Sequence, residues 1–456
     1  MVSKSSSFVI QWLYFFITHI HIVMISMIFL SILACAPKNT LQRESFDYVW
    51  NTVNQTFPYR DFQNVDWQET YTEFRPKAYK AQSTQELRPI LQEMLARLKV
   101  SHYGIIPKET YEQKKQEKKS SQSKEDSPSE NPIGLGWNGI DSRWIEEQLV
   151  ITHVDLPAKE LGILPGWVIT EIDNVSTTKM TELFSESKDD LAFDMGLLAQ
   201  HKTYGLIDKN RDFLLLDHDN QSHRISLPYQ KGDGMIAEFG YLPPCLVRFH
   251  HSTREDNIHI IAFNTFMMPI RPQIQKAFQK IAQQETTGLI IDLRGNLGGM
   301  IGLGSGLAGH LISEPEQNLG AQISRSGKIF FQINPQSKRM RYDGPVAVLI
   351  DELSVSTSEI LAGGLKELAR AQIFGQKTPG KALPSIVSQL PNGDGFQYVI
   401  ADLKTPKGNR YEGHGVTPDV IIHPSRNDYI QGKDPTLDAA IQWISNTNTI
   451  PNKENP

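Results

Sequence analysis

The chain has 456 residues, 39% of them hydrophobic, and a formal net charge of −5 at pH 7. This length exceeds what one hydrophobic core usually holds, so we expect two or three domains. The balanced, slightly acidic composition suits a globular enzyme and gives no electrostatic case for a nucleic-acid partner.

Residues 1–35 form a distinct leading segment. The run from Phe8 to Leu33 is almost uncharged, and it ends in Ser31-Ile-Leu-Ala-Cys35. This ending resembles the cleavage site of bacterial lipoproteins, which implies a lipid on Cys35 and a signal segment before it. The run is also long enough to cross a bilayer, so a membrane-spanning anchor is the alternative. Both interpretations predict a membrane-anchored, extracytoplasmic protein, in the periplasm or at the cell surface.

Residues 36–108 are predicted to form a helical N-terminal region. Apolar residues recur at helical spacing in Phe46-Asp-Tyr-Val-Trp-Asn-Thr-Val53 and again from Glu86 to Leu98. Residues 109–131 are rich in Lys, Glu, Ser and Gln and nearly free of apolar side chains. Such a composition with alternating charge predicts a flexible linker rather than a basic binding site.

Residues 132–230 change to a pattern of short strands. The run Gly134-Leu135-Gly136-Trp137 comes first, and the apolar runs Leu149–Ala158 and Leu161–Asp173 follow it. This order resembles a PDZ domain. The resemblance implies that Gly134, Leu135 and Gly136 offer backbone amides to a peptide carboxylate, while the next strand pairs with the peptide. A PDZ fold that serves only as a lid or spacer is the alternative.

Residues 231–447 are predicted to form the catalytic domain, with 448–456 as a tail. Strand-like and helix-like runs alternate from Ile258 onward, through the strand at Gly288, the strand at Val346 and the helix at Glu359. Alternation of this kind predicts an α/β layer with largely parallel strands. Sites in such sheets lie at the carboxyl ends of the strands. The whole chain is therefore predicted to be a multidomain α/β protein.

The most informative turn follows the apolar strand Val346–Ile350. It reads Ser354-Val-Ser356-Thr-Ser358-Glu359 and places hydroxyl groups where a helix begins. The positive end of a helix stabilises a developing oxyanion, and a strand-to-helix bend exposes a nucleophile. No Gly-x-Ser-x-Gly motif is present, so the base must come from elsewhere. Lys381, in Thr378-Pro-Gly-Lys381, lies 25 residues after Ser356.

These motifs resemble the tail-specific, or carboxyl-terminal processing, serine peptidases. Gly288-Leu-Ile-Ile-Asp-Leu-Arg-Gly-Asn-Leu-Gly-Gly299 upstream and Glu412-Gly-His-Gly-Val-Thr-Pro-Asp419 downstream add to the resemblance. It implies a core of the ClpP/crotonase type, with Ser356 as nucleophile and Lys381 as general base. It further implies an oxyanion hole built from Gly298 or Gly299 and the amide of Thr357. The alternatives are a helix N-cap role for Ser356 and a solvated loop position for Lys381.

A second arrangement of the base is also open. Members with a lysine base carry a glutamine four residues after it, whereas Ser385 stands there in this chain. The run Leu98-Lys-Val-Ser101-His102-Tyr-Gly104 resembles the Ser-His element of the tricorn protease. That resemblance implies His102 as base, Ser101 as its neighbour and Glu412 as the orienting carboxylate. Lys381 is preferred narrowly because its local spacing matches.

The sequence thus predicts a serine endopeptidase that cuts unfolded or exposed polypeptides near their carboxyl termini. A catalytically inactive peptide-binding scaffold is the rival hypothesis, and Ser385 is the residue that favours it. No cofactor and no metal are predicted, because His250, His251 and His259 cluster without a paired ligand set. Gly304-Ser-Gly-Leu-Ala-Gly309 is interpreted as small-residue helix packing rather than nucleotide binding. The oligomeric state is not predicted.

Overall fold

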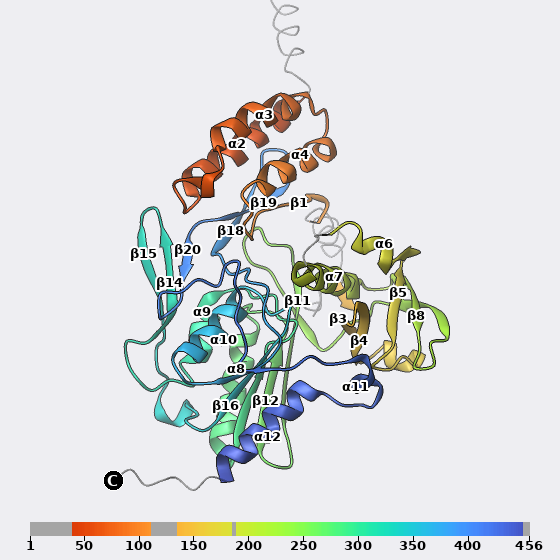
Figure 1. The fold of residues 1–456 in the computed structure, drawn as a ribbon, viewed down its shortest axis with the longest axis vertical. Coiled ribbons are helices and arrows are strands. Elements are labelled where there is room, and N and C mark those ends of the chain that lie inside the picture. The colour runs from red at the N-terminus through yellow and green to blue at the C-terminus, as the bar shows by residue number, and fades with distance from the viewer. Residues whose placement is uncertain (1–38, 111–134, 185–187, 450–456) are drawn as a thin grey trace, which may run out of the picture.

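The computed structural model describes residues 39–110, 135–184 and 188–449 (Figure 1). Cys35 and Gly134, for which the sequence predicts lipidation and peptide binding, lie outside these ranges. Most of the predicted linker, 109–131, does so too. Within the described ranges, no helix combines the length and the apolar character needed to span a bilayer.

The N-terminal region is helical, as predicted. It contains α2 (Thr40–Thr56), the short 3₁₀ helix η1 (Phe62–Asn64), α3 (Trp67–Lys80) and α4 (Thr84–Ala96). Helix α3 was not among the elements predicted; its start is fixed by Asp66, whose side chain accepts from the amide of Glu69 at 2.9 Å. Ser83 caps α4 in the same way. The facing sides bury Phe46, Val53, Phe57, Phe74, Leu87, Leu91 and Met94.

The helices do not form a core by themselves. A short strand after α4, β1 (Gly104–Ile106), pairs antiparallel with β19 (Gly395–Val399), which pairs in turn with β18 (Ser385–Gln389). Leu390, Phe396 and Tyr398 from this sheet join the helical core. Figure 1 shows the three helices seated on this small sheet, above the rest of the molecule. Residues near 100 and near 400 are thereby held side by side.

The middle region is rich in β-structure. Its sheet has the order β3-β4-β5-β8-β9, and β6 (Val175–Ser176) pairs with β5. The strands are β3 (Ile140–Ile145), β4 (Gln148–Val154), β5 (Val168–Ile172), β8 (Asn210–Leu216) and β9 (Ser222–Pro228). Two helices, α6 (Thr177–Thr181) and α7 (Lys188–Thr203), occupy the stretch between β6 and β8. A separate two-stranded ribbon joins β2 (Leu135–Trp137) to β7 (Tyr204–Leu206).

A seven-stranded sheet forms the centre of the C-terminal half. Its order is β10-β11-β12-β13-β16-β17-β21, and every pair from β12 to β21 is parallel, as predicted. The strands are β10 (Gly234–Ala237), β11 (Cys245–Thr253), β12 (Ile258–Phe263), β13 (Gly288–Asp292), β16 (Val346–Ile350), β17 (Gln372–Gly375) and β21 (Val420–Ile421). The central strand β16 is buried at every residue, which is typical of a sheet covered on both faces.

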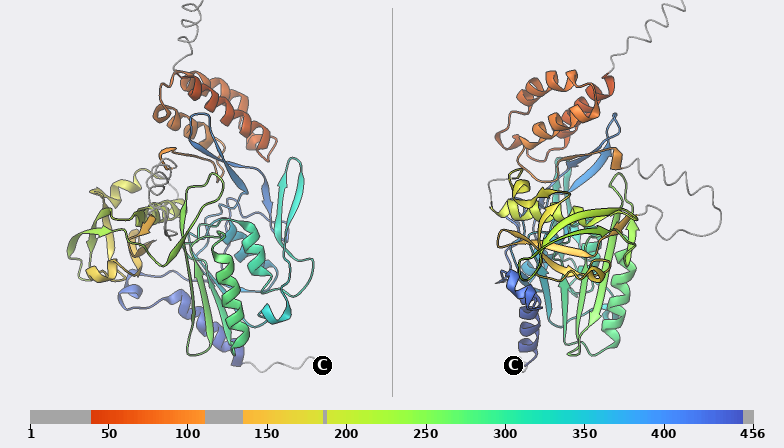
Figure 2. Two further views of the ribbon diagram at one scale, coloured as in Figure 1. Left: turned by 180° about the vertical axis from the view of Figure 1, so that it is seen from behind. Right: turned by 90° about the vertical axis from the view of Figure 1, so that its right-hand side faces the viewer.

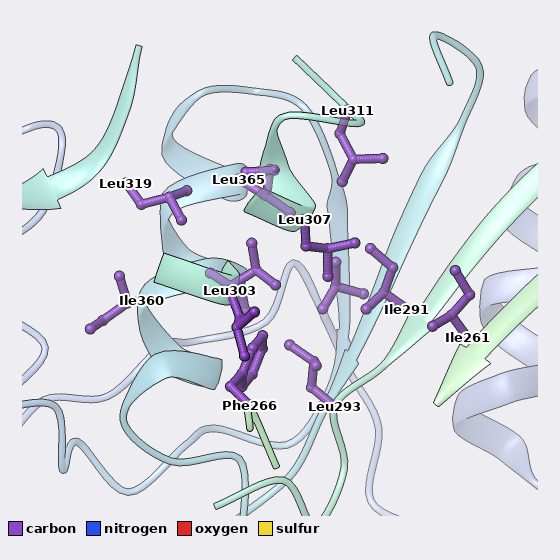
Figure 3. Close-up of a cluster of buried hydrophobic side chains, with 14 of the residues drawn as sticks. Ile261, Phe266, Ile291, Leu293, Leu303, Leu307, Leu311, Leu319, Ile360 and Leu365 are labelled. Atoms are coloured by element: carbon purple, nitrogen blue, oxygen red, sulfur yellow. The ribbon is translucent and has the colours of Figure 1, made fainter. Parts of the chain in front are cut away.

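Helices cover both faces of this sheet. One face carries α8 (Ile270–Gln283), α9 (Ile301–Ala308) and α10 (Thr357–Glu367), and the other carries α12 (Pro435–Thr449). Figure 3 shows the first of these cores, in which Leu303 and Leu307 of α9 and Ile360 and Leu365 of α10 pack with Ile291 of β13. Of the glycines in α9, Gly304 lies against α10, because an added Cβ would meet Thr357 Cγ2 at 3.0 Å.

Other elements of the C-terminal half lie outside the large sheet. A small sheet has the order β15 (Gly327–Gln332), β14 (Asn318–Ser324) and β20 (Asp402–Lys404), and α11 (Arg426–Ile430) precedes α12. In the side view of Figure 2 the β-rich region lies against the parallel sheet, below the N-terminal helices. The β-rich region reaches the carboxyl ends of β13 and β16, where Gln200 Nε2 donates to the Gly295 carbonyl and Arg143 Nε donates to Asp351.

Candidate active site

The serine-rich turn lies at the carboxyl end of β16, where α10 begins. Ser354 and Ser358 are fully buried, and their hydroxyls bind the turn after β13: Ser354 Oγ to the Leu293 carbonyl at 2.7 Å and Ser358 Oγ to the Asn296 carbonyl at 2.8 Å. Ser356 is the partly exposed serine of the three. Its φ of 58° lies in the left-handed region, a strained conformation for a non-glycine residue. The turn therefore exposes Ser356, while the hydroxyls of Ser354 and Ser358 bind the neighbouring turn and hold the two together.

Glu359, three residues after Ser356, holds the turn in shape. Its buried carboxylate accepts from the Ser356 amide at 3.1 Å, the Lys381 amide at 2.9 Å and the Gly380 amide at 2.7 Å. The hydroxyl of Thr378 donates to it at 2.6 Å. Burial raises the pKa of this carboxyl to about 7, against the opposing effect of its four donors. One carboxylate thus joins the serine turn to the segment that carries Lys381.

The glycine turn after β13 lies directly against the serine turn. A Cβ on Gly298 would approach the Cβ of Ser356 to 2.7 Å, and Gly298 and Gly299 have φ of +83° and +133°. Thr357 Oγ1 donates to the Gly299 carbonyl at 2.7 Å and fixes the two turns together. The Gly298 amide is engaged by Asn296 Oδ1 at 2.9 Å. Within the described residues, the amides of Gly299 and Thr357 have no such protein acceptor.

Ser101, His102 and Glu412 meet although 311 residues separate the first from the last. Ser101 Oγ lies 2.6 Å from His102 Nδ1 and donates to Glu412 Oε2 at 2.9 Å. Glu412 also accepts from the Ser101 amide at 2.7 Å and from the Ala382 amide at 3.0 Å. The β1–β19 pairing brings the two segments together. The three residues that the tricorn resemblance selects therefore form one hydrogen-bonded chain beside Lys381.

The electrostatics of this chain keep His102 neutral. Burial lowers the pKa of His102 to about 4, and the nearby charge of Lys381 adds to the effect. Burial raises the pKa of Glu412, while its hydrogen bonds to Ser101 and Ala382 oppose the rise. A neutral imidazole can accept a proton, which is the state that a general base requires.

Lys381 lies in the site, but its ammonium group points to α7. Nζ is 3.5 Å from Asp190 Oδ1 and 4.8 Å from the centroid of the Phe193 ring. Its backbone carbonyl accepts from the Ser356 amide at 3.0 Å. Ser385, at the position of the expected glutamine, is the first residue of β18, and its hydroxyl accepts from Gln397 Nε2 at 3.0 Å. The departure from the lysine-base pattern thus has a structural role in the small sheet.

Helix α7 of the β-rich region packs against the site, which the sequence did not predict. Phe193 forms a buried cluster with Leu353 and Val355, the residues on either side of Ser354. A Cβ on Gly196 would lie 3.2 Å from the Leu353 side chain. The apolar residues of α7 are spaced without a clear helical face in the sequence, so no periodic signal marked this contact.

The predicted peptide-binding residues that the structure describes belong to a paired strand. Leu135 and Gly136 of β2 lie opposite Leu206 and Gly205 of β7. A Cβ on Gly136 would approach the Gln230 carbonyl to 2.7 Å, so the glycine allows a close crossing of two chain segments. Binding of a peptide carboxylate at this strand stays a prediction.

The histidine cluster has a local role on β11 and β12. His251 Nε2 lies 3.0 Å from His259 Nδ1. Burial lowers the pKa of both rings, and that of His259 to about 4. In the part of the chain that the structure describes, no group of three His, Cys, Asp or Glu residues could hold a metal ion.

The comparisons with known proteins agree with this geometry. Residues 257–422 match peptidase family S41, and residues 41–96 match the tricorn protease C1 domain. The carboxyl-terminal-processing protease of Synechocystis sp. is 24% identical over 377 residues, covering 82% of this chain and 79% of its own. The chloroplastic C-terminal processing peptidase of Tetradesmus obliquus is 32% identical over 160 residues, covering 35% of this chain and 34% of its own.

Two solved structures share the fold. The photosystem II D1 C-terminal processing protease superposes with a TM-score of 0.53 at 20% identity, covering 84% of this chain and 94% of that one. Mature CPAF superposes with a TM-score of 0.59 at 13% identity, covering 91% and 99%.

A serine at a strained strand-to-helix turn, packed against a glycine turn, together with the match to peptidase family S41, indicates a serine peptidase. Residues 257–422 match the family that the sequence motifs predicted, peptidase family S41.

Proposed function

We propose that the protein is an endopeptidase that cuts exposed or unfolded polypeptides near their carboxyl termini, with Ser356 as nucleophile and His102 as general base. The observation that carries this assignment is the chain from His102 Nδ1 through Ser101 Oγ to Glu412. The names of the similar processing proteases support the choice of substrate region.

The hydrogen bonds of the chain fix the tautomer of His102. If the Ser101 hydroxyl donates to Glu412, its oxygen must accept from His102, so the proton of the neutral ring is on Nδ1. Nε2 is then free to take the proton of the Ser356 hydroxyl as the oxygen attacks the peptide carbonyl. The same proton passes to the leaving amine, and water repeats the sequence on the acyl-enzyme. Glu412 stabilises the imidazolium through Ser101, as the carboxylate does in other serine peptidases.

The amides of Gly299 and Thr357 are the proposed oxyanion hole. Both lie beside Ser356, and Thr357 is the first residue of α10, so the helix adds its positive end. Of the two predicted glycines, Gly299 is favoured because the amide of Gly298 is engaged by Asn296.

Lys381 as base is the second candidate, since its spacing from Ser356 matches the lysine-dependent relatives. A lysine must lose its proton to act as a base, and burial away from carboxylates promotes that loss. Here the Lys381 ammonium group forms an ion pair with a carboxylate, Asp190 of α7, at 3.5 Å. The ion pair therefore argues for His102.

The test compares three alanine variants on an unstructured protein substrate. We expect Ser356→Ala and His102→Ala each to lower kcat by about 10⁴-fold or more, and Lys381→Ala to keep turnover within about tenfold. Loss of activity in Lys381→Ala with retention in His102→Ala would assign the base to the lysine. Hydrolysis that survives in Ser356→Ala would reject the nucleophile, and wild-type inactivity would support the scaffold hypothesis.

The remaining assignments are part of the same proposal. We propose that the β-rich region, residues 132–230, is PDZ-like and binds peptide, and that the catalytic region, 231–447, has a ClpP/crotonase-type core. The leading segment would place the enzyme outside the cytoplasm, on a membrane through a lipid on Cys35. Metabolic labelling with palmitate, compared between wild type and Cys35→Ala, tests the lipid.

A further inference from the structure

Lys381 has no task once His102 acts as the base, and the inference below rests on that part of the proposed function. The backbone of Lys381 is nevertheless fixed in the site by hydrogen bonds. Its carbonyl accepts from the Ser356 amide at 3.0 Å, and its own amide donates to Glu359 at 2.9 Å. The backbone at Lys381 is therefore fixed on both sides to the nucleophile turn, and the side chain begins at a set position beside Ser356.

The ammonium group of Lys381 is partly exposed to solvent. Its side chain is 27% exposed, and its carboxylate partner Asp190 is 46% exposed. The distance of 3.5 Å is long for an ion pair, and ion pairs as exposed as this one contribute little to stability. The contact with Asp190 is thus weak enough for another carboxylate to replace it.

The other side of the ammonium group is apolar. Nζ lies 4.8 Å from the Phe193 ring, which is buried against Leu353 and Val355. The Lys381 ammonium group thus has a weakly bound carboxylate, Asp190, on one side and an aromatic ring on the other. This is the arrangement of an anion-binding site in which a carboxylate of the protein occupies the position of the ligand. The low polarity of the wall strengthens the attraction to an entering anion.

The charge of Lys381 also acts on the reacting groups. Burial is the larger cause of the low pKa of His102, and the charge of Lys381 adds to it. Burial raises the pKa of Glu412 and of Asp194 on α7, and the charge of Lys381 opposes both rises. These effects place the cation near the proposed base. A carboxylate bound to it would lie within a few residues of the bond that Ser356 attacks.

We propose that Lys381 is a specificity-determining residue that binds a carboxylate of the substrate in place of Asp190. The ligand is either the α-carboxylate of a chain whose end lies close to the cleaved bond or the side chain of an Asp or Glu near that bond. Asp190 is then an internal competitor that occupies the ammonium group until the substrate enters.

The experiment uses three peptides that wild type cuts within a few residues of the carboxyl terminus. The first two share one sequence and end in a free acid and in a carboxamide. The third is the carboxamide with its last residue replaced by Glu. A charged hydrogen bond of this kind contributes roughly tenfold in kcat/KM, so we expect wild type to prefer the acid by roughly that factor. Lys381→Gln should lose the preference and cut acid and amide at equal rates, and Lys381→Arg should keep the preference.

Two further variants sharpen the result. Asp190→Asn removes the internal competitor, so KM for the acid should fall several-fold with kcat unchanged. Lys377→Gln, an exposed lysine four residues earlier, is the matched control and should behave as wild type. If the Glu-terminated carboxamide recovers the rate of the acid, the receptor takes either carboxylate; if it does not, the receptor is specific for the chain end.

The outcomes separate this inference from the proposed function. If Lys381→Gln keeps turnover and still prefers the acid, the carboxylate receptor is wrong while His102 as base stands. If Lys381→Gln abolishes turnover of the acid and the amide alike while thermal unfolding is unchanged, Lys381 is the base and both proposals fall.

Discussion

The two halves of the proposed catalytic machinery, one with the nucleophile and one with the base, are built in opposite ways. The nucleophile half comes from two turns of one sheet, at the ends of the adjacent strands β13 and β16, and its hydrogen bonds run among Leu293, Asn296, Ser354 and Ser358. The base half joins Ser101 to Glu412 across 311 residues and depends on the three-stranded sheet β1-β19-β18. The first half is local and visible in a motif, whereas the second exists only after distant parts of the chain have assembled.

Apart from the changes at Ser356 and His102 themselves, the largest effect on turnover is expected from the local half, at Gly298. In Gly298→Ala the new Cβ would lie 2.7 Å from the Ser356 Cβ and from the Val355 carbonyl, at a φ of +83°. Displacing the nucleophile from the oxyanion hole should lower kcat by about 100-fold or more, measured on a peptide substrate. Gly302→Ala, where a Cβ meets nothing within 4 Å, is the control and should keep full activity. Equal activity of the two variants would contradict the close packing of the turns.

The distant half is tested by Glu412→Gln and Ser101→Ala. Each substitution removes a hydrogen bond that orients His102 through Ser101, so each should lower kcat by roughly 100-fold with little change in KM. Because both residues act on one imidazole, the double variant should be hardly slower than either single one. Effects that multiply would show that the two residues act separately.

A smaller effect is expected at Glu359, which joins the two halves. Its pKa of about 7 means that it loses its negative charge as pH falls through 7, and with it one acceptor for the turn. Turnover should therefore decline on the acid side of pH 7 although His102, with a pKa of about 4, is still neutral. Glu359→Gln should show several-fold lower kcat at pH 8 and no decline near pH 7 in a pH profile.

The stability contribution of Glu359 runs in the other direction. A carboxyl with a raised pKa in the folded state stabilises the fold below its unfolded value of about 4.5, and this contribution is lost as pH rises through about 7. Urea unfolding of wild type should show this slope between pH 4.5 and 7, and the Gln variant should lack it. The same slope in both proteins would assign it to another group.

The smallest effect on turnover is expected at the docking of the helical region. Arg88 of α4 pairs with Asp394 at 2.7 Å, and the Asp394 side chain is fully buried. Arg88→Ala leaves that carboxylate without its cation and should cost about 3 kcal/mol of stability, measured by chemical unfolding. Turnover at 25 °C should fall only a few-fold, because Glu412 still holds Ser101. A loss as large as that of Glu412→Gln would show that helix docking alone positions His102.

The sequence predicted the local half well. The strand at Val346, the serine turn, the glycine turn and the parallel sheet all follow from apolar runs and from residues with strict backbone requirements. Such signals are short-range and survive in a single sequence. The family assignment is confirmed by the comparisons.

The sequence predicted the distant half only as an alternative. Ser101 and His102 lie in a short turn without a periodic pattern, and nothing near them indicates that Glu412 is a partner. The pairing of β1 with β19 connects residues near 105 and 396, a contact that propensity does not encode. The packing of α7 against Leu353 could not be predicted from the sequence for the same reason, because it depends on how two domains contact each other.

The two attachments of Glu412 have a consequence for the order of folding and activation. This carboxylate holds the Ser101 amide from the beginning of the protein and the Ala382 amide from its last third. A partly synthesised chain can contain the serine turn and still lack the assembled Ser101–Glu412 contact. If His102 is the base as proposed, proteolytic activity arises only after the whole molecule has folded, and an unfinished copy does not digest itself or its neighbours.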